Sequence, residues 1–332
     1  MIIRKSAYFD RFTCIAAACP DSCCKEWDVQ VDAAAAELYR SLPGALGDRL
    51  RQVLREEDGE TVMTIEAGRC PMWRSDGLCR IQAELGHDAL CHTCREFPRL
   101  THDYGDFVEK GLELSCPEAA RLILSSPYLP PVSEECPGGE APEYDEETME
   151  ILLRTRQEAL RLLCDTPDLP EALTLLLLYG YHAQALVDGE EDFPFDAAAA
   201  LESARQFAGE PLPLQEFFLG LEILTEEWRN LLSAPATADL WREEHRRLAC
   251  YFVERYWLQA VSDYDLVSRV KLAVVSCLLV RALGGDVLRT AQLYSKEIEN
   301  DADNVDALLD GAYTHPALTD AALLGALLEV EQ

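Results

Sequence analysis

Residues 19–24 of this chain read Cys-Pro-Asp-Ser-Cys-Cys, and residues 91–94 read Cys-His-Thr-Cys. Cysteines three or four residues apart on a loop or a helical turn can direct their sulfurs at one centre. Thiolates favour zinc, copper(I) and iron–sulfur clusters over hard cations. This spacing therefore predicts a metal or cluster site in an irregular, cysteine-rich first part of the chain.

Eight cysteines form the predicted ligand set, which would serve one or two metal centres. They are Cys19, Cys23, Cys24, Cys70, Cys79, Cys91, Cys94 and Cys116. Cys14 is a ninth candidate outside this set. His87 and His92 could add a nitrogen ligand, but their charged neighbours favour an interpretation as exposed surface side chains.

A disulfide framework is the main alternative for these cysteines, and it requires an oxidising compartment. Residues 1–11, MIIRKSAYFDR, lack the apolar core of a signal peptide. Adjacent Cys23 and Cys24 are also poorly placed for two separate bridges. We therefore expect free thiols and a cytoplasmic location. Cys164, Cys250 and Cys277 lie in apolar helical patterns and are interpreted as small buried hydrophobic residues.

Length and charge limit the classes of function. With 332 residues and a formal net charge of −31, the chain can bury a large core and would be repelled by a phosphate backbone. Residues 1–135 hold 15 Lys and Arg against 23 Asp and Glu, and the rest hold 14 against 37. We expect no nucleic-acid partner, and no apolar run is long enough to predict a membrane span.

The pattern predicts a mainly α protein of two domains: a cysteine-rich metal-cluster domain with minor β structure at 1–135, and an α-helical bundle at 145–332. In the first domain we expect helices at 32–40, 47–55 and 117–124, and strands at 61–65 and 107–114. The Pro- and Gly-rich stretch 125–144 is interpreted as a linker. Beyond it, apolar spacings of three and four predict helices at 149–163, 171–187, 197–207, 214–232, 241–258, 266–283, 286–300 and 304–309.

Several common catalytic motifs are absent from the sequence, including a Gly-rich nucleotide loop after a strand, a P-loop and G-x-S-x-G. No catalytic residue is assigned. A polar patch, Tyr294-Ser-Lys-Glu-Ile-Glu-Asn300, instead interrupts an otherwise apolar helical region. Capping and solvation explain much of this patch, and a lip facing a substrate is the alternative.

A set of motifs forms a recognisable pattern along the chain. They are Tyr8…Phe12-x-Cys14, Cys19-x-Asp-Ser-Cys-Cys-x-x-Trp27-x-Val29, Cys70-Pro71…Gly77-Leu-Cys-x-Ile81, Leu85-Gly86…Leu90-Cys-x-Thr-Cys-x-x-x-Pro-Arg99, Leu114-Ser-Cys-Pro-Glu-Ala-Ala-Arg-Leu122 and Tyr294-Ser-Lys-Glu-x-Glu299. Together they resemble the flagellin lysine-N-methylase family, and more widely the zinc- or iron-chelating cysteine-cluster proteins. One residue departs from the family pattern: Glu26 stands where the family usually has glycine.

This resemblance implies methyl transfer from S-adenosylmethionine to lysine side chains of a protein such as flagellin, with a [4Fe-4S] cluster taking part and zinc as the alternative metal. It leads us to expect S-adenosylmethionine between the two domains, near the 294–300 segment, with Tyr294 and Glu297 as candidate cofactor-binding residues. The alternative function is a non-catalytic zinc- or iron-chelating module that binds a protein partner.

Overall fold

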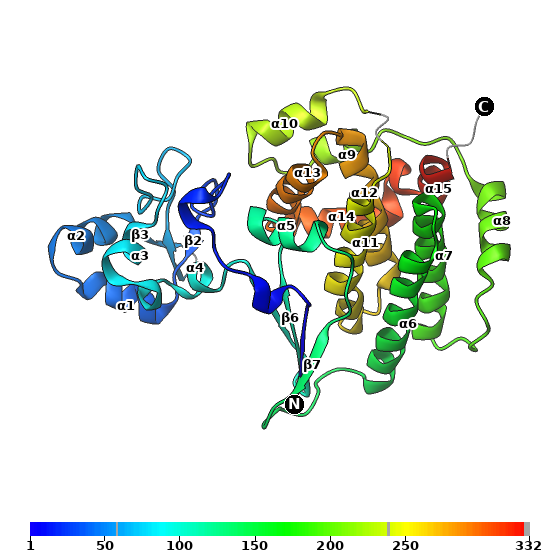
Figure 1. The fold of residues 1–332 in the computed structure, drawn as a ribbon, viewed down its shortest axis with the longest axis horizontal. Helices are drawn as coiled ribbons and strands as arrows, with labels where there is room; N and C mark the ends of the chain where they lie inside the picture. The colour runs from blue at the N-terminus through cyan, green and yellow to red at the C-terminus, as the bar shows by residue number, and fades with distance from the viewer. Residues whose placement is uncertain (58, 238–239, 329–332) are drawn as a thin grey trace.

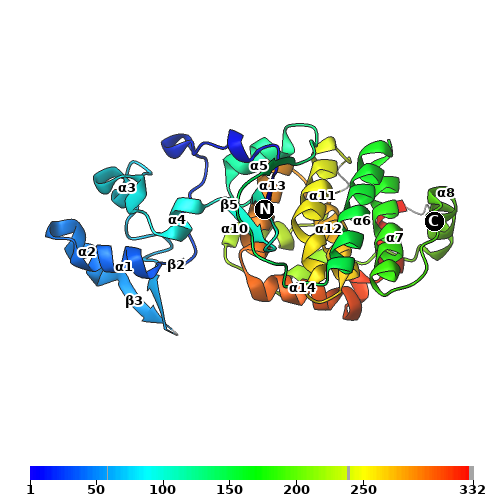
Figure 2. The ribbon, with the colours of Figure 1, turned by 90° about the horizontal axis from the view of Figure 1, so that it is seen from below.

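The computed structural model describes residues 1–57, 59–237 and 240–328, and it shows a smaller and a larger body side by side (Figure 1). Figure 2, turned by 90°, shows the same separation. Each body has its own hydrophobic core. One core is built from residues between Val29 and Cys91, and the other joins Tyr8, Phe12 and residues between Phe107 and Leu124 to the helices of the second half.

The smaller body carries short elements around a compact core centred on fully buried Tyr39 and Leu50. Asp32 caps its first helix by accepting from the Ala35 N–H at 3.1 Å. Its helices are α1 (Ala33–Ser41), α2 (Gly44–Val53), α3 (Arg80–Leu85) and α4 (His92–Glu96), and its strands, in the sheet order β2-β4-β3, are β2 (Val29–Gln30), β4 (Glu60–Met63) and β3 (Leu54–Glu57).

A second sheet, with strand order β5-β6-β1-β7, belongs to the larger body. Its strands are β1 (Ile2–Lys5), β5 (Arg99–Asp103), β6 (Phe107–Leu112) and β7 (Val132–Glu135). β1 pairs in parallel with β6 and antiparallel with β7. The minor β content is as expected, but the sequence predicted only two strands, at 61–65 and 107–114. β1 was missed because it pairs with strands more than 100 residues away, which a local pattern does not reveal.

The predicted mainly α fold is confirmed, and the described residues after 145 are mainly helical as expected. α5 (Pro117–Leu124), α8 (Ala197–Phe207) and α12 (Leu266–Leu283) have the predicted bounds. The other helices are α6 (Glu146–Asp165), α7 (Leu169–Val187), α9 (Leu214–Leu219), α10 (Glu226–Ser233), α11 (Glu243–Tyr256), α13 (Val287–Tyr294), α14 (Ala302–Thr314) and α15 (Asp320–Leu328).

Two predictions about elements were wrong. The helix expected at 214–232 is broken into α9 and α10, because the chain turns at Gly220 and Thr225 caps the next helix by accepting from the Trp228 N–H at 3.1 Å. The stretch 125–144 is not only a linker, since it contains β7. Edge strands pair through backbone groups and need no apolar alternation, and β7 is exposed along its length.

The division into domains at 135 and 145 stays a prediction. The packing places Tyr8, Phe12, β6 and α5 on the core of the helical body, while residues between Val29 and Cys91 form a core of their own. In the described part of the chain, no helix is both long and apolar enough to cross a membrane.

We predict that stability falls in mild acid through His245, a fully buried residue of α11. Burial lowers the pKa of this imidazole from 6.5 to about 4. Between pH 6.5 and pH 4 the imidazole is therefore protonated in the unfolded chain but mostly neutral in the folded chain. The free energy of unfolding falls by about 3 kcal/mol over this range. Urea unfolding at several pH values measures this loss.

The pH dependence of the unfolding free energy is compared between the unmodified chain and two variants. The loss should disappear in His245→Gln and should remain in His87→Gln, the control at an exposed position. An unchanged pH dependence in His245→Gln would contradict the assignment.

Candidate metal centre

The first cysteine run lies on a loop in which the Asp21 and Ser22 side chains accept hydrogen bonds from backbone N–H groups. The Ser22 N–H donates to Asp21 Oδ1 at 2.8 Å, and the Cys24 N–H donates to Ser22 Oγ at 3.1 Å. Asp and Ser side chains favour such turns because they replace a backbone acceptor. The loop therefore holds Cys23 and Cys24 at a bend.

Other cysteines approach this loop from separate segments of the chain. The Cys70 N–H donates to the Cys24 carbonyl at 2.8 Å, which places these two residues side by side. Cys79 is the residue before α3. Cys91 directly precedes α4, and Cys94 lies in the same helical turn. The local fold thus directs cysteines from distant positions toward one region.

The thiols themselves are neighbours. Cys23 lies within electrostatic reach of Cys19, Cys79, Cys94 and Cys116. Three pairs of thiols are in hydrogen-bond contact, namely Cys23–Cys24, Cys24–Cys70 and Cys91–Cys94. The structure thus brings all eight predicted ligands into one neighbourhood, and Cys14 joins it beside Cys19.

The geometry is not that of a site closed around one ion. Within the described ranges, no three Cys, His, Asp or Glu side chains are placed so that they could hold a metal ion. The donor chemistry does fit a soft metal or an iron–sulfur cluster, because every cysteine of the chain, all of them in described positions, is a free thiol. The ligand set and the identity of the metal therefore stay predictions.

Burial and contacts with neighbouring thiols raise the pKa of most of these groups above the usual value for cysteine. It raises the pKa of Cys116 to about 12. At Cys24 the hydrogen bond with Cys23 lowers the pKa, but contact with Cys70 and burial outweigh it and raise the pKa to about 12. The hydrogen bond with Cys94 lowers the pKa of Cys91 to about 7. Thiolates this close together repel one another, so the set needs added positive charge to ionise fully.

Solvent reaches part of the group. Cys23 and Cys94 are exposed, whereas Cys70, Cys91 and Cys116 are buried. The two histidines interpreted as surface side chains, at positions 87 and 92, are both exposed.

Of the cysteines interpreted as buried hydrophobic residues, Cys250 and Cys277 are buried as expected. Cys164 is exposed, and that interpretation was wrong. It lies one residue before the end of α6, where the helix surface is open to solvent.

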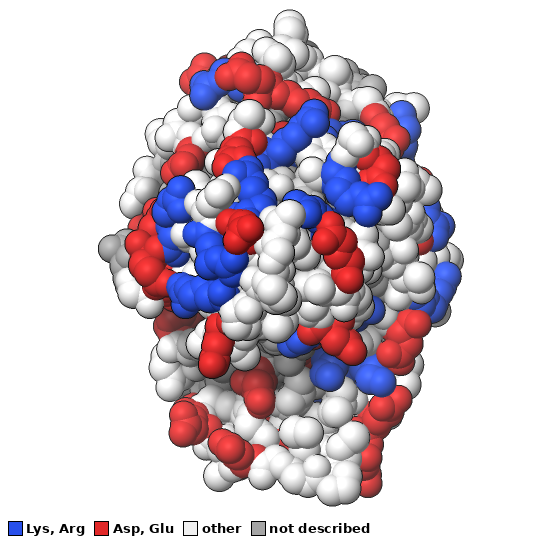
Figure 3. Space-filling model, turned by 90° about the vertical axis from the view of Figure 1, so that its left-hand side faces the viewer, with Lys and Arg blue, Asp and Glu red and all other residues white. Residues whose placement is uncertain are grey.

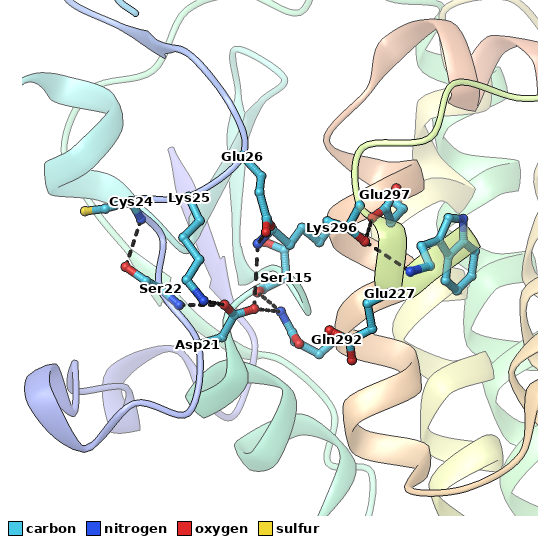
Figure 4. A network of polar contacts seen from close by, with 12 residues as sticks. Asp21, Ser22, Cys24, Lys25, Glu26, Ser115, Glu227, Gln292, Lys296 and Glu297 are labelled. Atoms are coloured by element: carbon cyan, nitrogen blue, oxygen red, sulfur yellow. Dashed lines mark hydrogen bonds and ion pairs between the residues drawn. The ribbon is translucent and has the colours of Figure 1, made fainter. Parts of the chain in front are cut away.

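The cysteine loop is joined to the helical body by a polar network around Asp21 (Figure 4). Lys296 Nζ lies 2.5 Å from Glu26 Oε2 and 3.7 Å from Asp21 Oδ2. Arg289 and Gln292 also reach Asp21 Oδ2, at 3.2 and 3.3 Å. Side chains more than 260 residues apart in the sequence thus fix the position of the loop.

Charge stabilises this network. Burial alone would raise the pKa of Asp21, but Lys296, the Ser22 N–H, Lys25 and Arg289 outweigh burial and hold the pKa at about 2. Asp21 is therefore a carboxylate at neutral pH. The Lys296 side chain is only 2% exposed, so its charge is directed at these two carboxylates and not at solvent.

The backbone conformation at Glu26 explains why the family pattern has glycine at this position. Its φ of 73° lies in the left-handed region, which favours glycine, the residue that the resemblance leads us to expect there. In this chain the strained position carries a carboxylate, and the ion pair with Lys296 gives that carboxylate a partner across the junction. Trp27, the next residue, has Lys296 Nζ 5.1 Å from its ring centre.

The 294–300 patch lies at this junction. Residues 294–298 are buried, so solvation does not explain them. Residues Ser295–Glu299 form a π-helical turn, a geometry often found at functional sites. Lys296 is the residue of the turn that reaches the cysteine loop.

Tyr294 and Glu297 point into the helical body instead. Tyr294 is fully buried, shares a 2.7 Å hydrogen bond with the Ser276 hydroxyl and packs against the Trp228 ring. Glu297 accepts from the Leu224 N–H at 2.8 Å and from the Thr225 hydroxyl. These contacts give both side chains a supporting role behind the turn, and their assignment to a cofactor stays a prediction.

Sequence reasoning missed the junction residues Asp21, Arg289 and Gln292. Asp21 and Lys296 stand inside motifs of the resemblance, which was the available signal for them. Arg289 and Gln292 lie on α13 outside any motif, and only the packing of α13 against α5 brings them to the loop.

The chain is similar to a small group of curated proteins. A lysine-N-methylase of Salmonella typhimurium is 34% identical over 140 residues, which are 40% of this chain and 35% of that protein. A lysine-N-methylase of Salmonella choleraesuis gives the same identity and coverage. This chain therefore spans 35% of the length of the lysine-N-methylases that it matches. No family model and no solved structure matches the chain.

A third relative is similar over most of its own length. The flagellar biosynthetic protein FliU of Salmonella muenchen is 35% identical over 132 residues, which are 38% of this chain and 78% of FliU. With this coverage of FliU and the matching lysine-N-methylases, the chain belongs to the flagellin lysine-N-methylase family.

Proposed function

We propose that this chain is a protein-lysine N-methyltransferase that uses S-adenosylmethionine and a thiolate-bound [4Fe-4S] cluster, with flagellin-type proteins as its substrates. The names of its relatives support the methyl transfer to lysine. One observation supports the site above all others: cysteines from separate segments gather beside the Lys296 turn, so motifs from both ends of the chain meet at one junction.

The cysteines that would hold the cluster, or zinc in its place, are Cys19, Cys23, Cys24, Cys70, Cys79, Cys91, Cys94 and Cys116. A bound cluster would supply an iron site for the amino and carboxylate groups of the methyl donor.

The chain's own residues position this region. Asp21 and Lys296 hold the cysteine loop against the helical body, and the Trp27 and Phe97 rings, with centres 6.0 Å apart, add apolar surface beside it.

The substrate lysine must lose its proton before it can accept a methyl group by a polar route. An acidic surface would attract a lysine-bearing protein, but acidic neighbours raise a lysine pKa, so the reacting point should be locally apolar. The chain after residue 135 carries 37 Asp and Glu against 14 Lys and Arg. On the end face formed by the smaller body, basic and acidic side chains are mixed (Figure 3). The helical body is therefore the proposed recruiting surface.

We expect S-adenosylmethionine to bind the cluster-loaded protein at least about tenfold more tightly than the stripped protein, because the donor would lose a metal contact. Isothermal titration measures this difference, and mass spectrometry of flagellin incubated with enzyme and donor measures added methyl groups. Equal affinity in both forms would reject a role for iron in holding the donor. Failure to bind in either form would favour the non-catalytic metal module.

A further inference from the structure

A cavity of about 90 Å³ lies inside the larger body, between the β5-β6-β1-β7 sheet and α11. Its volume is enough for several water molecules or one small organic molecule. The strand register sets its floor: Arg4 of β1 and His102 of β5 both lie opposite Glu109 of β6. Directly opposed residues share a face of the sheet, so these three side chains form one row across the cavity.

Gly111 makes room for this cavity. It lies two residues beyond Glu109 on β6 and therefore on the same face of the sheet. A Cβ built there meets no atom within 4 Å. Glycine within a strand often marks a place where a ligand approaches the backbone.

Three buried polar atoms that line the cavity have no hydrogen-bond partner in the described part of the chain. They are Arg4 Nη1, Ser6 Oγ and His102 Nε2. A buried polar group without a hydrogen bond costs about 1–3 kcal/mol, so three such groups in one cavity make it suited to a polar ligand. The guanidinium of Arg4 can only donate, and a hydroxyl and an imidazole can also donate, so the group that they suit carries acceptor oxygens.

Beside the sheet face that lines the cavity, two guanidinium groups lie near one carboxylate, so one positive charge is in excess. Glu109 accepts from both terminal nitrogens of Arg156, at 2.6 and 2.9 Å. Arg4 lies 3.7 Å from the same carboxylate, beyond hydrogen-bond distance. Two guanidinium groups therefore share one carboxylate, and Arg4 keeps the capacity to bind a second.

On the opposite side of the cavity, α11 contributes a carboxyl group, that of Glu254. Glu254 accepts a hydrogen bond from the Tyr128 hydroxyl at 2.5 Å and has no ion-pair partner within the described residues that would neutralise it. Burial raises its pKa, although Arg156 acts in the other direction. Its neighbour Arg255 is already paired with Glu299 at 3.2 Å. Leu100, Leu112 and Leu129 add apolar surface between the two walls.

We propose that this cavity binds a free α-amino acid with an apolar side chain. Its carboxylate would accept hydrogen bonds from Arg4 and Ser6, its ammonium group would donate to Glu254, and its side chain would fill the space that Gly111 leaves open. This site uses none of the cysteines and does not depend on the proposed methyl transfer.

The test is isothermal titration of the full chain with L-leucine and L-methionine, with N-acetyl-L-leucine and L-leucinamide as ligands lacking one charge. We expect the free amino acids to bind and each blocked form to bind at least about tenfold more weakly, since a charge-assisted hydrogen bond is lost. Gly111→Val should abolish binding and keep the fold, because valine suits a strand and its side chain meets open space.

Arg4→Met should weaken binding at least about tenfold. Lys5→Met is the matched control on the same strand, because Lys5 pairs with Glu134 and lies outside the cavity. Absence of binding at millimolar concentration, equal binding of N-acetyl-L-leucine, or retained binding in a folded Gly111→Val protein would each overturn the proposal. Binding that persists in iron-stripped protein separates this site from the cysteine site.

Discussion

Replacing Cys19 or Cys94 with alanine is expected to remove most of the bound iron and to lower the midpoint of thermal unfolding. Both thiols lie within electrostatic reach of Cys23, although they come from different segments of the chain. A metal held by thiolates contributes its binding free energy to folding, so the loss of one ligand weakens the smaller body as well as the site. Iron and sulfide analysis after anaerobic purification measures the first effect, and calorimetry measures the second.

Cys136→Ala is the matched control for this experiment. Cys136 is also a free thiol in the first half of the chain, but it follows β7 and stands outside the predicted ligand set. Its replacement should leave the iron content unchanged. Full metal content in both Cys19→Ala and Cys94→Ala would show that these cysteines are not ligands.

Replacing Lys296 with methionine should loosen the cysteine loop and cost about 3 kcal/mol, because it leaves two carboxylates facing each other without their shared cation. Asp21 keeps Arg289 and Lys25 as partners, whereas Glu26 loses its ion pair across the junction. Hydrogen exchange should therefore increase at residues 19–27, and the protein should lose iron faster to a chelator.

The control is Lys271→Met, which removes another buried lysine whose ion pair lies within one body. Lys271 is 4% exposed and pairs with Asp320 at 2.9 Å, remote from the cysteine loop. This variant should lose stability without faster exchange at residues 19–27. Equal exchange of the loop in the two variants would show that Lys296 stabilises the helical body alone.

The helical half follows closely from the sequence. The helices at 117–124, 197–207 and 266–283 have their predicted bounds, because local signals define both ends. Asp196 accepts from the Ala198 and Ala199 N–H groups at the start of α8, and Gly284 adopts a φ of 68° after α12. Such signals act over a few residues and can be read from a single sequence.

Cys19 and Cys23, and likewise Cys91 and Cys94, could be named as candidates from spacing alone, since three- and four-residue intervals follow helical and turn geometry. Their meeting could not be derived in this way. Cys70 joins Cys24 through a backbone hydrogen bond, and Cys116 reaches the group from the start of α5. These approaches depend on how separate segments pack.

The sequence by itself thus determined the mainly helical class and the bounds of the helices at 117–124, 197–207 and 266–283, because periodicity and capping act over a few residues. Only the tertiary structure decided the mixed sheet, in which Ile2 pairs with Phe107 and with Glu135. It also decided the junction, where Lys296 meets Glu26 from 270 residues away. Pairing and ion pairs over such separations leave no period in the sequence, because backbone groups are the same at every residue and a single charge has no pattern of its own.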